Sequence, residues 1–133
     1  MAWIFTSLAM TMTKKILVIE DDAEAREIMR KALEKRGYAV AVAENGLYGY
    51  DTAVYLRPDL IVTEIREPAA DGIRVVRRVR DTASLEATPI LVITSFGTGS
   101  ATFSLQQGAD AYEPKPIDPQ SFLATVERLL AEN

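Results

Sequence analysis

The sequence predicts an α/β fold in which a parallel, five-stranded sheet is covered by helices on both faces. Short apolar runs of strand length alternate along the chain with segments whose apolar residues recur at the 3.6-residue period of a helix. The runs expected at the centre of the sheet are solidly apolar, which is typical of parallel strands buried on both faces. These two observations predict a three-layer, doubly wound arrangement.

The first half of the chain predicts three strands and two helices. The apolar run at 16–19 predicts the first strand, and residues 38–43 predict the second. Asn45-Gly46 precedes a helix that we expect to reach residue 56, and residues 60–62 predict the third strand. The helix between the first two strands is expected to end before Gly37 and to place five apolar residues on its inner face: Ala25, Ile28, Met29, Ala32 and Leu33.

The second half continues the alternation. Apolar residues at helical spacing predict a helix around 73–79, and residues 90–93 predict a fourth strand. A short fifth strand is expected around 111–112. The last helix follows Asp118, a favourable N-cap, with Pro119 at its first position. The helix around 73–79 carries four basic residues that we expect to form its solvated face: Arg74, Arg77, Arg78 and Arg80.

The segment 95–109 departs from this regular pattern because it has no charged residue. It contains Gly97 and Gly99 and is rich in serine and threonine, which predicts a short or mobile helix. Any partner surface there should be neutral and lightly apolar. The apolar residues expected on contact surfaces are Phe96, Phe103 and Leu105 in this segment, and Leu47 and Tyr48 in an earlier helix.

The composition predicts one small domain and excludes several classes of site. With 133 residues, 48% of them hydrophobic, the chain is long enough for one core. The net charge of −4 gives no general attraction to nucleic acid or to an anionic membrane, so we expect direct binding to neither. Because cysteine and histidine are absent, any metal must be held by oxygen. These features predict a cytoplasmic domain.

Residues 1–13 stand apart as an extension of the domain, which we expect to occupy residues 14–133. The extension carries no charged side chain, and it is too short for a membrane span, which needs about 20 apolar residues. Two interpretations stay open. The extension is a disordered, mis-assigned start or an expression-derived leader, or it binds a partner or a second copy of the domain through Trp3, Ile4, Phe5 and Leu8.

Polar residues follow four strands of the predicted sheet. Acids at 20–22 follow the first strand, Glu64 ends the third, Thr94 ends the fourth and Lys115 follows the fifth. Functional groups in parallel α/β folds collect beyond the carboxyl ends of the strands, at the point where strand order reverses. We therefore expect acids, a hydroxyl and a lysine to converge on one crevice.

Four segments, in this order, resemble the receiver domains of bacterial response regulators. They are Lys15–Asp22, Pro58–Pro68 with Asp71-Gly72, Pro89–Ser95 and Gly108–Ile117. Each segment alone is a weak indication of the family, whereas the four in this order and spacing are a strong one. The resemblance covers about residues 14–133. It implies a flavodoxin-like receiver fold with strand order 2-1-3-4-5 and a function in two-component phosphorelay signalling.

The resemblance implies a cation site in the acidic part of the crevice. Glu20 and Asp21 correspond to the acidic pair that organises Mg²⁺, and clustered carboxylates repel one another unless a cation joins them. The implied ligand set also includes Glu64 and the backbone carbonyl of Arg66.

The resemblance assigns switch functions to residues of the last two strands. Thr94 corresponds to the switch hydroxyl and Tyr112 to the aromatic residue that changes rotamer. Lys115 corresponds to the ammonium that binds the phosphoryl group, and the bond between Lys115 and Pro116 is a cis peptide in this family. These implied functions carry the signal from the pocket to a partner surface.

Glu64 stands where the family has the aspartate that accepts the phosphoryl group. The added methylene moves the carboxylate by ~1.5 Å, and a displacement of about this size slows a geometry-dependent reaction on the order of 100-fold. We therefore expect impaired phosphotransfer. One interpretation is a direct ion pair with Lys115 that imitates an aspartyl phosphate and makes the domain constitutively active. The others are a tolerated carboxylate in a degenerate pocket, residual phosphorylation and an engineered substitution.

The predicted function is that of a receiver domain, not an enzyme, whose output is protein–protein binding. The expected partners are a sensor histidine kinase, a phosphotransfer protein or a downstream regulator, and the chain is expected to be a monomer or a weak homodimer. A degenerate scaffold or dimerisation module is one alternative, and an Mg²⁺-dependent phosphatase-like enzyme is another. A flavodoxin-like cofactor binder is disfavoured, because an acidic pocket repels phosphate.

Overall fold

The protein folds as five strands that alternate with five helices. The computed structural model describes residues 13–65, 70–95 and 98–132. Along the chain the elements are β1 (Lys15–Ile19), α2 (Ala23–Lys35), β2 (Ala39–Ala43), α3 (Gly46–Leu56), β3 (Leu60–Ile65), α4 (Ala70–Asp81), β4 (Ile90–Thr94), α5 (Thr98–Gln106), β5 (Ala111–Pro114) and α6 (Pro119–Ala131).

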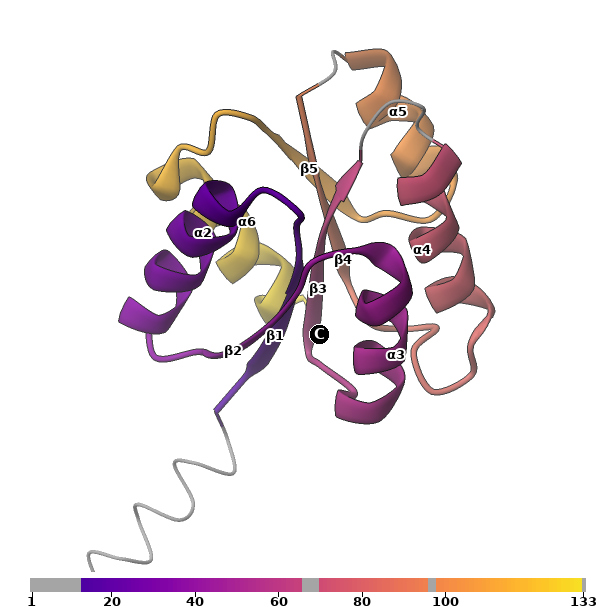
Figure 1. Ribbon diagram of the computed structural model, residues 1–133, viewed down its shortest axis with the longest axis horizontal. Helices are drawn as coiled ribbons and strands as arrows, with labels where there is room; N and C mark the ends of the chain where they lie inside the picture. Colours follow the sequence, from indigo (N-terminus) through magenta and orange to yellow (C-terminus); the bar gives the residue numbers. More distant parts are fainter. Residues whose placement is uncertain (1–12, 66–69, 96–97, 133) are drawn as a thin grey trace, which may run out of the picture.

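The strands form one parallel sheet between two layers of helices. The strand order is β2-β1-β3-β4-β5, and every neighbouring pair is parallel. Helices α2 and α6 lie on one face of this sheet, whereas α3, α4 and α5 lie on the other (Figure 1). The three-layer, doubly wound fold and its strand order 2-1-3-4-5 are therefore confirmed.

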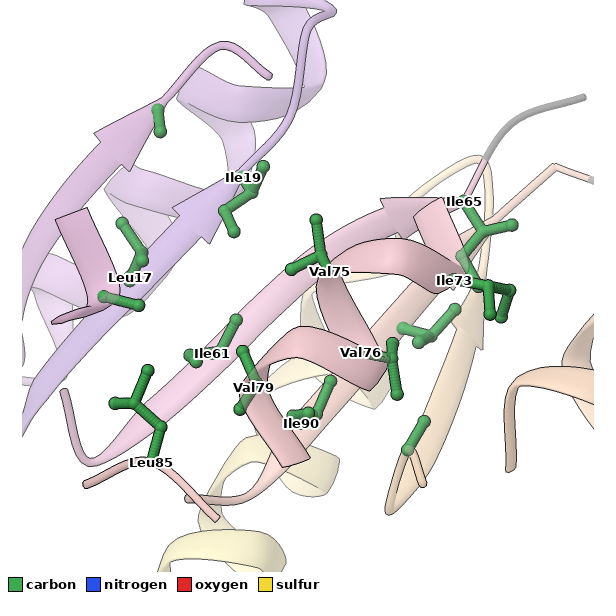
Figure 2. Packing of buried hydrophobic residues seen from close by; sticks show 14 residues of the cluster. Leu17, Ile19, Ile61, Ile65, Ile73, Val75, Val76, Val79, Leu85 and Ile90 are labelled. Atoms are coloured by element: carbon green, nitrogen blue, oxygen red, sulfur yellow. The ribbon is translucent and has the colours of Figure 1, made fainter. Parts of the chain in front are cut away.

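The sheet separates two apolar cores, because successive strand side chains point to opposite faces. Leu17, Ile61 and Val92 pack with α3 and α4 on one side, where Figure 2 shows Ile61 beside Val79. Ile16, Val62, Leu91 and their neighbours pack with α2 and α6 on the other side, around the fully buried Phe122. Burial on both faces explains why the central strands are continuous apolar runs.

Polar side chains cap the N-termini of three helices. Asp22 accepts a hydrogen bond from the backbone N–H of Glu24 at 3.1 Å, and Asn45 accepts one from Tyr48 at 3.0 Å. Asp118, the predicted N-cap of α6, accepts one from Gln120 at 3.1 Å. These side chains satisfy backbone donors that the first turn of a helix leaves unpaired.

Some elements differ in extent from the predictions. Strand β3 continues to Ile65 and β5 to Pro114, so both are longer than expected. The prediction that Ile28 faces the core is wrong, since its side chain is 39% exposed. Helix α5 is short, as expected, with nine residues. Residues 1–12 lie outside the described part of the chain, so the expectations for Trp3 to Leu8 and the boundary near residue 14 stay predictions.

The prediction that Arg80 belongs to the solvated face of α4 is wrong. Its guanidinium donates hydrogen bonds to the backbone carbonyls of Gly108 at 2.9 Å, Thr88 at 2.7 Å and Glu86 at 3.1 Å, and it pairs with Asp110 at 2.7 Å. Arg80 therefore joins α4 to the loops before β4 and β5.

Two further arginines of α4 bind neighbouring helices. Arg78 lies over the ring of Tyr50, 3.8 Å from its centroid, which is a cation–π contact between α3 and α4. Arg77 donates a hydrogen bond to Gln107 at 2.6 Å. The basic side of α4 thus contributes to packing. Within the described residues, no helix combines the length and apolar character that a membrane crossing requires.

The core on the α2 and α6 side predicts the cost of truncating Phe122. Phe122→Ala should lower the free energy of unfolding by about 3–5 kcal/mol, because it removes a fully buried ring and leaves a cavity. Urea unfolding followed by circular dichroism measures this difference. The matched control is Phe103→Ala on α5, whose ring is exposed and whose loss should have little effect. Equal costs for the two variants would contradict this packing.

The contacts of Arg80 predict a second stability difference. Arg80→Met keeps much of the aliphatic side chain but removes every donor, and we expect it to lower the free energy of unfolding by about 1.5–3 kcal/mol, as for hydrogen bonds of a charged group. Arg74→Met, on the exposed surface of the same helix, is the control with the same change of charge. Indistinguishable urea midpoints for the two variants would be inconsistent with a structural function of Arg80.

Candidate functional site

The carboxyl ends of β1, β3 and β4 meet at one edge of the sheet. Ile19 pairs with Thr63, and Ile65 pairs with Thr94. Glu20 therefore follows β1 beside the end of β3, where Glu64 is the second-last residue. This register explains how residues distant in the sequence form one site.

Glu20 lies in the turn between β1 and α2, with its side chain directed into the protein. The residue is only 1% exposed. Its backbone N–H donates to the carbonyl of Ala43 at 3.0 Å, and its own carbonyl accepts from Nη1 of Arg26 at 2.9 Å. The backbone N–H of Asp22 donates to Oε2 of Glu20 at 3.4 Å. Contacts from β2 and α2 therefore hold this acid in place.

Lys115 brings a positive charge to the two glutamates. Its Nζ lies 2.5 Å from Oε1 of Glu20 and donates a hydrogen bond to Oε2 of Glu64. The backbone N–H of Lys115 donates to the carbonyl of Thr94 at 2.9 Å, and the expected cis peptide between Lys115 and Pro116 is present. The Glu64–Lys115 ion pair, which was one of the interpretations left open by the sequence, is present in the structure.

Glu20, Asp21 and Glu64 form a cluster of oxygen ligands. One carboxylate oxygen from each lies within 4.8 Å of the others, with Glu20 buried, Glu64 half-buried and Asp21 exposed. Hard divalent cations prefer such oxygen ligands.

The electrostatics of the cluster indicate an excess of negative charge. Burial, and then the carboxylates of Glu20 and Asp21, raise the pKa of Glu64 to about 8, and Lys115 opposes this only in part. Burial tends to lower the pKa of Lys115, but its contacts with Glu20 and Glu64 outweigh burial, so the pKa is raised. The raised pKa of Glu64 favours a neutral acid, whereas the contact of Glu64 with Lys115 favours the carboxylate. We take the pair as charged, because the ammonium of Lys115 contacts both Glu64 and Glu20.

The residues fit a divalent cation. Three carboxylates face one ammonium, which leaves two negative charges unmatched when all the acids are ionised. Oε1 of Glu20 is fully buried, and Nζ of Lys115 forms an ion pair with it at 2.5 Å. Such an atom has a high desolvation cost. An ion with two positive charges would match both the charge and this oxygen.

The other expected site residues lie on β4, on β5 or outside the described residues. Thr94 is buried at the end of β4, next to the strand that carries Glu64. Tyr112 is on β5 opposite Val92, with its side chain partly exposed. Arg66, the expected carbonyl ligand, lies outside the described residues. The described cluster therefore contains Glu20, Asp21, Glu64 and Lys115.

Two residues that support the site were not predicted from the sequence. Arg26 binds the carbonyl of Glu20 from α2, and only its position one turn into the helix could have suggested this. Glu113 is a buried acid on β5 that accepts hydrogen bonds from Ser121 at 2.8 Å and Thr125 at 2.7 Å. Glu113 thereby joins α6 to the strand before Lys115.

The fold and the acidic cluster agree with the comparison to known families. The family model for the response regulator receiver domain matches residues 16–127. The chain belongs to this family. Receiver domains act in two-component signalling and typically bind Mg²⁺ at an acidic pocket, and a Glu-Asp-Glu cluster is present in this chain.

Relatives in sequence and structure include response regulators. Response regulator MprA of Mycobacterium sp. (strain KMS) is 38% identical over 120 residues, which are 90% of this chain and 51% of that protein. The receiver domain thus spans about half the length of the curated relatives it matches. The chemotaxis response regulator CheY4 of Vibrio cholerae has a TM-score of 0.81 at 27% identity, over 88% of this chain and 98% of that one.

A third relative has a metal ion in its structure. The receiver domain of a sensor histidine kinase from Pseudomonas aeruginosa has a TM-score of 0.81 at 24% identity, over 90% of this chain and 98% of that one. It has a magnesium ion coordinated in its active-site cleft. At this identity the similarity shows the fold alone.

The place of Glu20 in the acidic cluster predicts a loss of Mg²⁺ affinity in Glu20→Gln. The affinity measured by isothermal titration calorimetry should fall by at least about tenfold, the smallest loss caused even by mutating partners outside the ligand shell. Glu24→Gln, on the exposed first turn of α2, has the same change of charge and should bind Mg²⁺ like the unaltered chain. Equal losses in both variants would mean that only the net charge matters.

Proposed function

We propose that Glu64 occupies the phosphoacceptor position of this receiver domain and that its ion pair with Lys115 replaces normal phosphotransfer. The contact of Lys115 with Glu64 and Glu20 carries this proposal. Output then occurs by protein–protein binding in a two-component pathway. A histidine kinase, a phosphotransfer protein or a downstream regulator is the partner.

The geometry of the pair supports impaired phosphotransfer. Phosphoryl transfer to a carboxylate needs a positioned oxygen nucleophile, and cations must offset the charge on the phosphoryl oxygens. The longer side chain brings Oε2 of Glu64 to the ammonium of Lys115. The cation that would bind a phosphoryl oxygen is therefore already paired with two carboxylates. A displacement of about 1 Å in such a reaction lowers the rate on the order of 100-fold.

The same contact supports a constitutive state. In a phosphorylated receiver domain the lysine pairs with an anionic group that extends beyond the acceptor, and the Glu64 carboxylate extends one methylene farther than an aspartate would. The Glu64–Lys115 pair thus imitates the charge and the reach of an aspartyl phosphate. Thr94 is the proposed switch hydroxyl, and Tyr112 is the proposed aromatic residue that responds to it.

A divalent cation has a supporting function in this proposal. Glu20, Asp21 and Glu64 would hold Mg²⁺, with the backbone carbonyl of Arg66 as a further proposed ligand. The ion would neutralise the carboxylates that Lys115 leaves unmatched. Bound Mg²⁺ supplies electrostatic stabilisation of phosphoryl oxygens in phosphotransfer.

Acetyl phosphate tests the effect of the added methylene. The unaltered chain, incubated with acetyl phosphate and Mg²⁺, should form no phosphoryl adduct in an intact mass measurement. Glu64→Asp restores the shorter side chain in the same pocket and should form one, because Glu20, Asp21 and Lys115 remain in place. Glu64→Gln is the control that has the length of glutamate but no nucleophilic carboxylate.

Each other outcome favours a different interpretation. A stable adduct on the unaltered chain that is absent from Glu64→Gln would overturn the proposal in favour of residual phosphorylation. Adducts on neither the unaltered chain nor Glu64→Asp would favour a degenerate scaffold or dimerisation module. Continuous release of phosphate by the unaltered chain would favour a phosphatase-like enzyme.

A further inference from the structure

Arg26 contacts the backbone of the acidic cluster although it is not one of the acids. Nη1 of Arg26 donates a hydrogen bond to the backbone carbonyl of Glu20 at 2.9 Å. This carbonyl belongs to the peptide bond that joins Glu20 to Asp21, and a peptide unit is planar. Arg26 therefore fixes the orientation of the planar unit that lies between two adjacent acids of the cluster.

The first turn of α2 brings Arg26 to this position. The helix begins at Ala23 after its N-cap Asp22, so Arg26 lies one turn beyond the cap. Its backbone N–H donates to the carbonyl of Asp22 at 2.9 Å. Long side chains of a helix point back toward the N-terminus of that helix. This direction carries the guanidinium from the first turn to the end of β1, where Glu20 lies.

Other hydrogen bonds hold the peptide units on either side of this one. The backbone N–H of Glu20 donates to the carbonyl of Ala43 at 3.0 Å, and the backbone N–H of Asp22 donates to Oε2 of Glu20 at 3.4 Å. Of these three contacts, that of Arg26 has a charged donor, and such hydrogen bonds are stronger than neutral ones. It can also be removed by a substitution that leaves every acid unchanged.

The orientation of this peptide unit affects where two ligands point. Glu20 is buried and Asp21 is exposed, yet one carboxylate oxygen of each lies within 4.8 Å of the other and of Glu64. A rotation of the peptide unit would move the two side chains relative to each other. Mg²⁺ demands nearly ideal octahedral geometry, so its affinity is sensitive to such a movement. Loss of a group that orients metal ligands typically lowers the affinity about 10- to 100-fold.

We propose that Arg26 is a positioning residue that sets the Mg²⁺ affinity of the acidic cluster by fixing the peptide unit between Glu20 and Asp21. This inference rests on the proposed Mg²⁺ site, but it does not depend on the proposed state of Glu64. The charge of the guanidinium acts in the opposite sense, because a positive charge near the cluster repels a cation. Positioning and charge therefore predict changes of opposite sign when Arg26 is replaced.

Arg26→Met tests the two effects against each other. Methionine keeps a long, unbranched side chain but has neither the donor nor the charge. The Mg²⁺ affinity of the complete chain, measured by isothermal titration calorimetry, should fall by about tenfold or more. Loss of the charge alone would raise it. Arg26→Lys keeps the charge and a donor group, so it should bind Mg²⁺ more tightly than Arg26→Met.

The matched control is Lys31→Met, also on α2. Lys31 is exposed, and this substitution removes the same charge without altering the hydrogen bond to Glu20. The Mg²⁺ affinity should not fall in this variant. Circular dichroism verifies that every variant is folded at the temperature of the titration. Urea midpoints measured without Mg²⁺ report the contribution of Arg26 to stability separately from its effect on the affinity.

Four results would overturn the proposal, and the titrations distinguish them. An unaltered chain that binds no Mg²⁺ would overturn the proposed cation site as well. Mg²⁺ binding by the unaltered chain with an equal or higher affinity in Arg26→Met would overturn the function of Arg26 alone. Weaker binding by Arg26→Lys than by Arg26→Met would assign the effect to charge. A loss in Lys31→Met as large as that in Arg26→Met would mean that the contact with Glu20 is irrelevant.

Discussion

The contact of one ammonium with a buried and a half-buried carboxylate is the interaction on which the pocket of this receiver domain depends. Lys115 pairs with Glu20 and Glu64, while Asp21 adds a third acid to the cluster. Without Lys115, Glu20 would be an uncompensated buried charge, a state that is strongly destabilising. With Lys115, the cluster still has excess negative charge, which raises the pKa of Glu64 to about 8. This partial compensation explains why the same residues suit both a cation and an internal ion pair.

The parallel sheet makes such a concentration of charge structurally tolerable. Its two apolar cores hold the strands, so that the acids emerge together at one edge. Hydrogen bonds outside the pocket then fix the connecting segments: Arg26 binds the turn at Glu20, and Glu113 joins β5 to α6. The pocket is therefore supported by hydrogen bonds that lie outside it, and the position of Glu64 depends on contacts from several elements.

Much of the fold and of the site could be predicted from local patterns. Apolar periodicity predicted the alternation of strands and helices, and the rule for parallel sheets predicted that Glu20, Glu64 and Lys115 would converge. Predictions from local patterns were wrong where the burial of a side chain depends on distant parts of the chain. Arg80 has the spacing of an exposed residue on α4, but carbonyls of Thr88 and Gly108 surround its guanidinium. Ile28 has the spacing of a core residue, but its side chain is 39% exposed.

The sequence by itself determined the chemical types at the pocket, including the glutamate at position 64. Oxygen ligands were the available choice for a metal, because the chain has neither cysteine nor histidine. Only the tertiary structure decided how these groups share charge. Lys115 is 51 residues from Glu64 in the sequence, and the distance between their charged atoms depends on β-strand register and on the backbone after β5. Electrostatic energies change steeply with separation and burial, so the sequence could offer this pairing only as one interpretation among several.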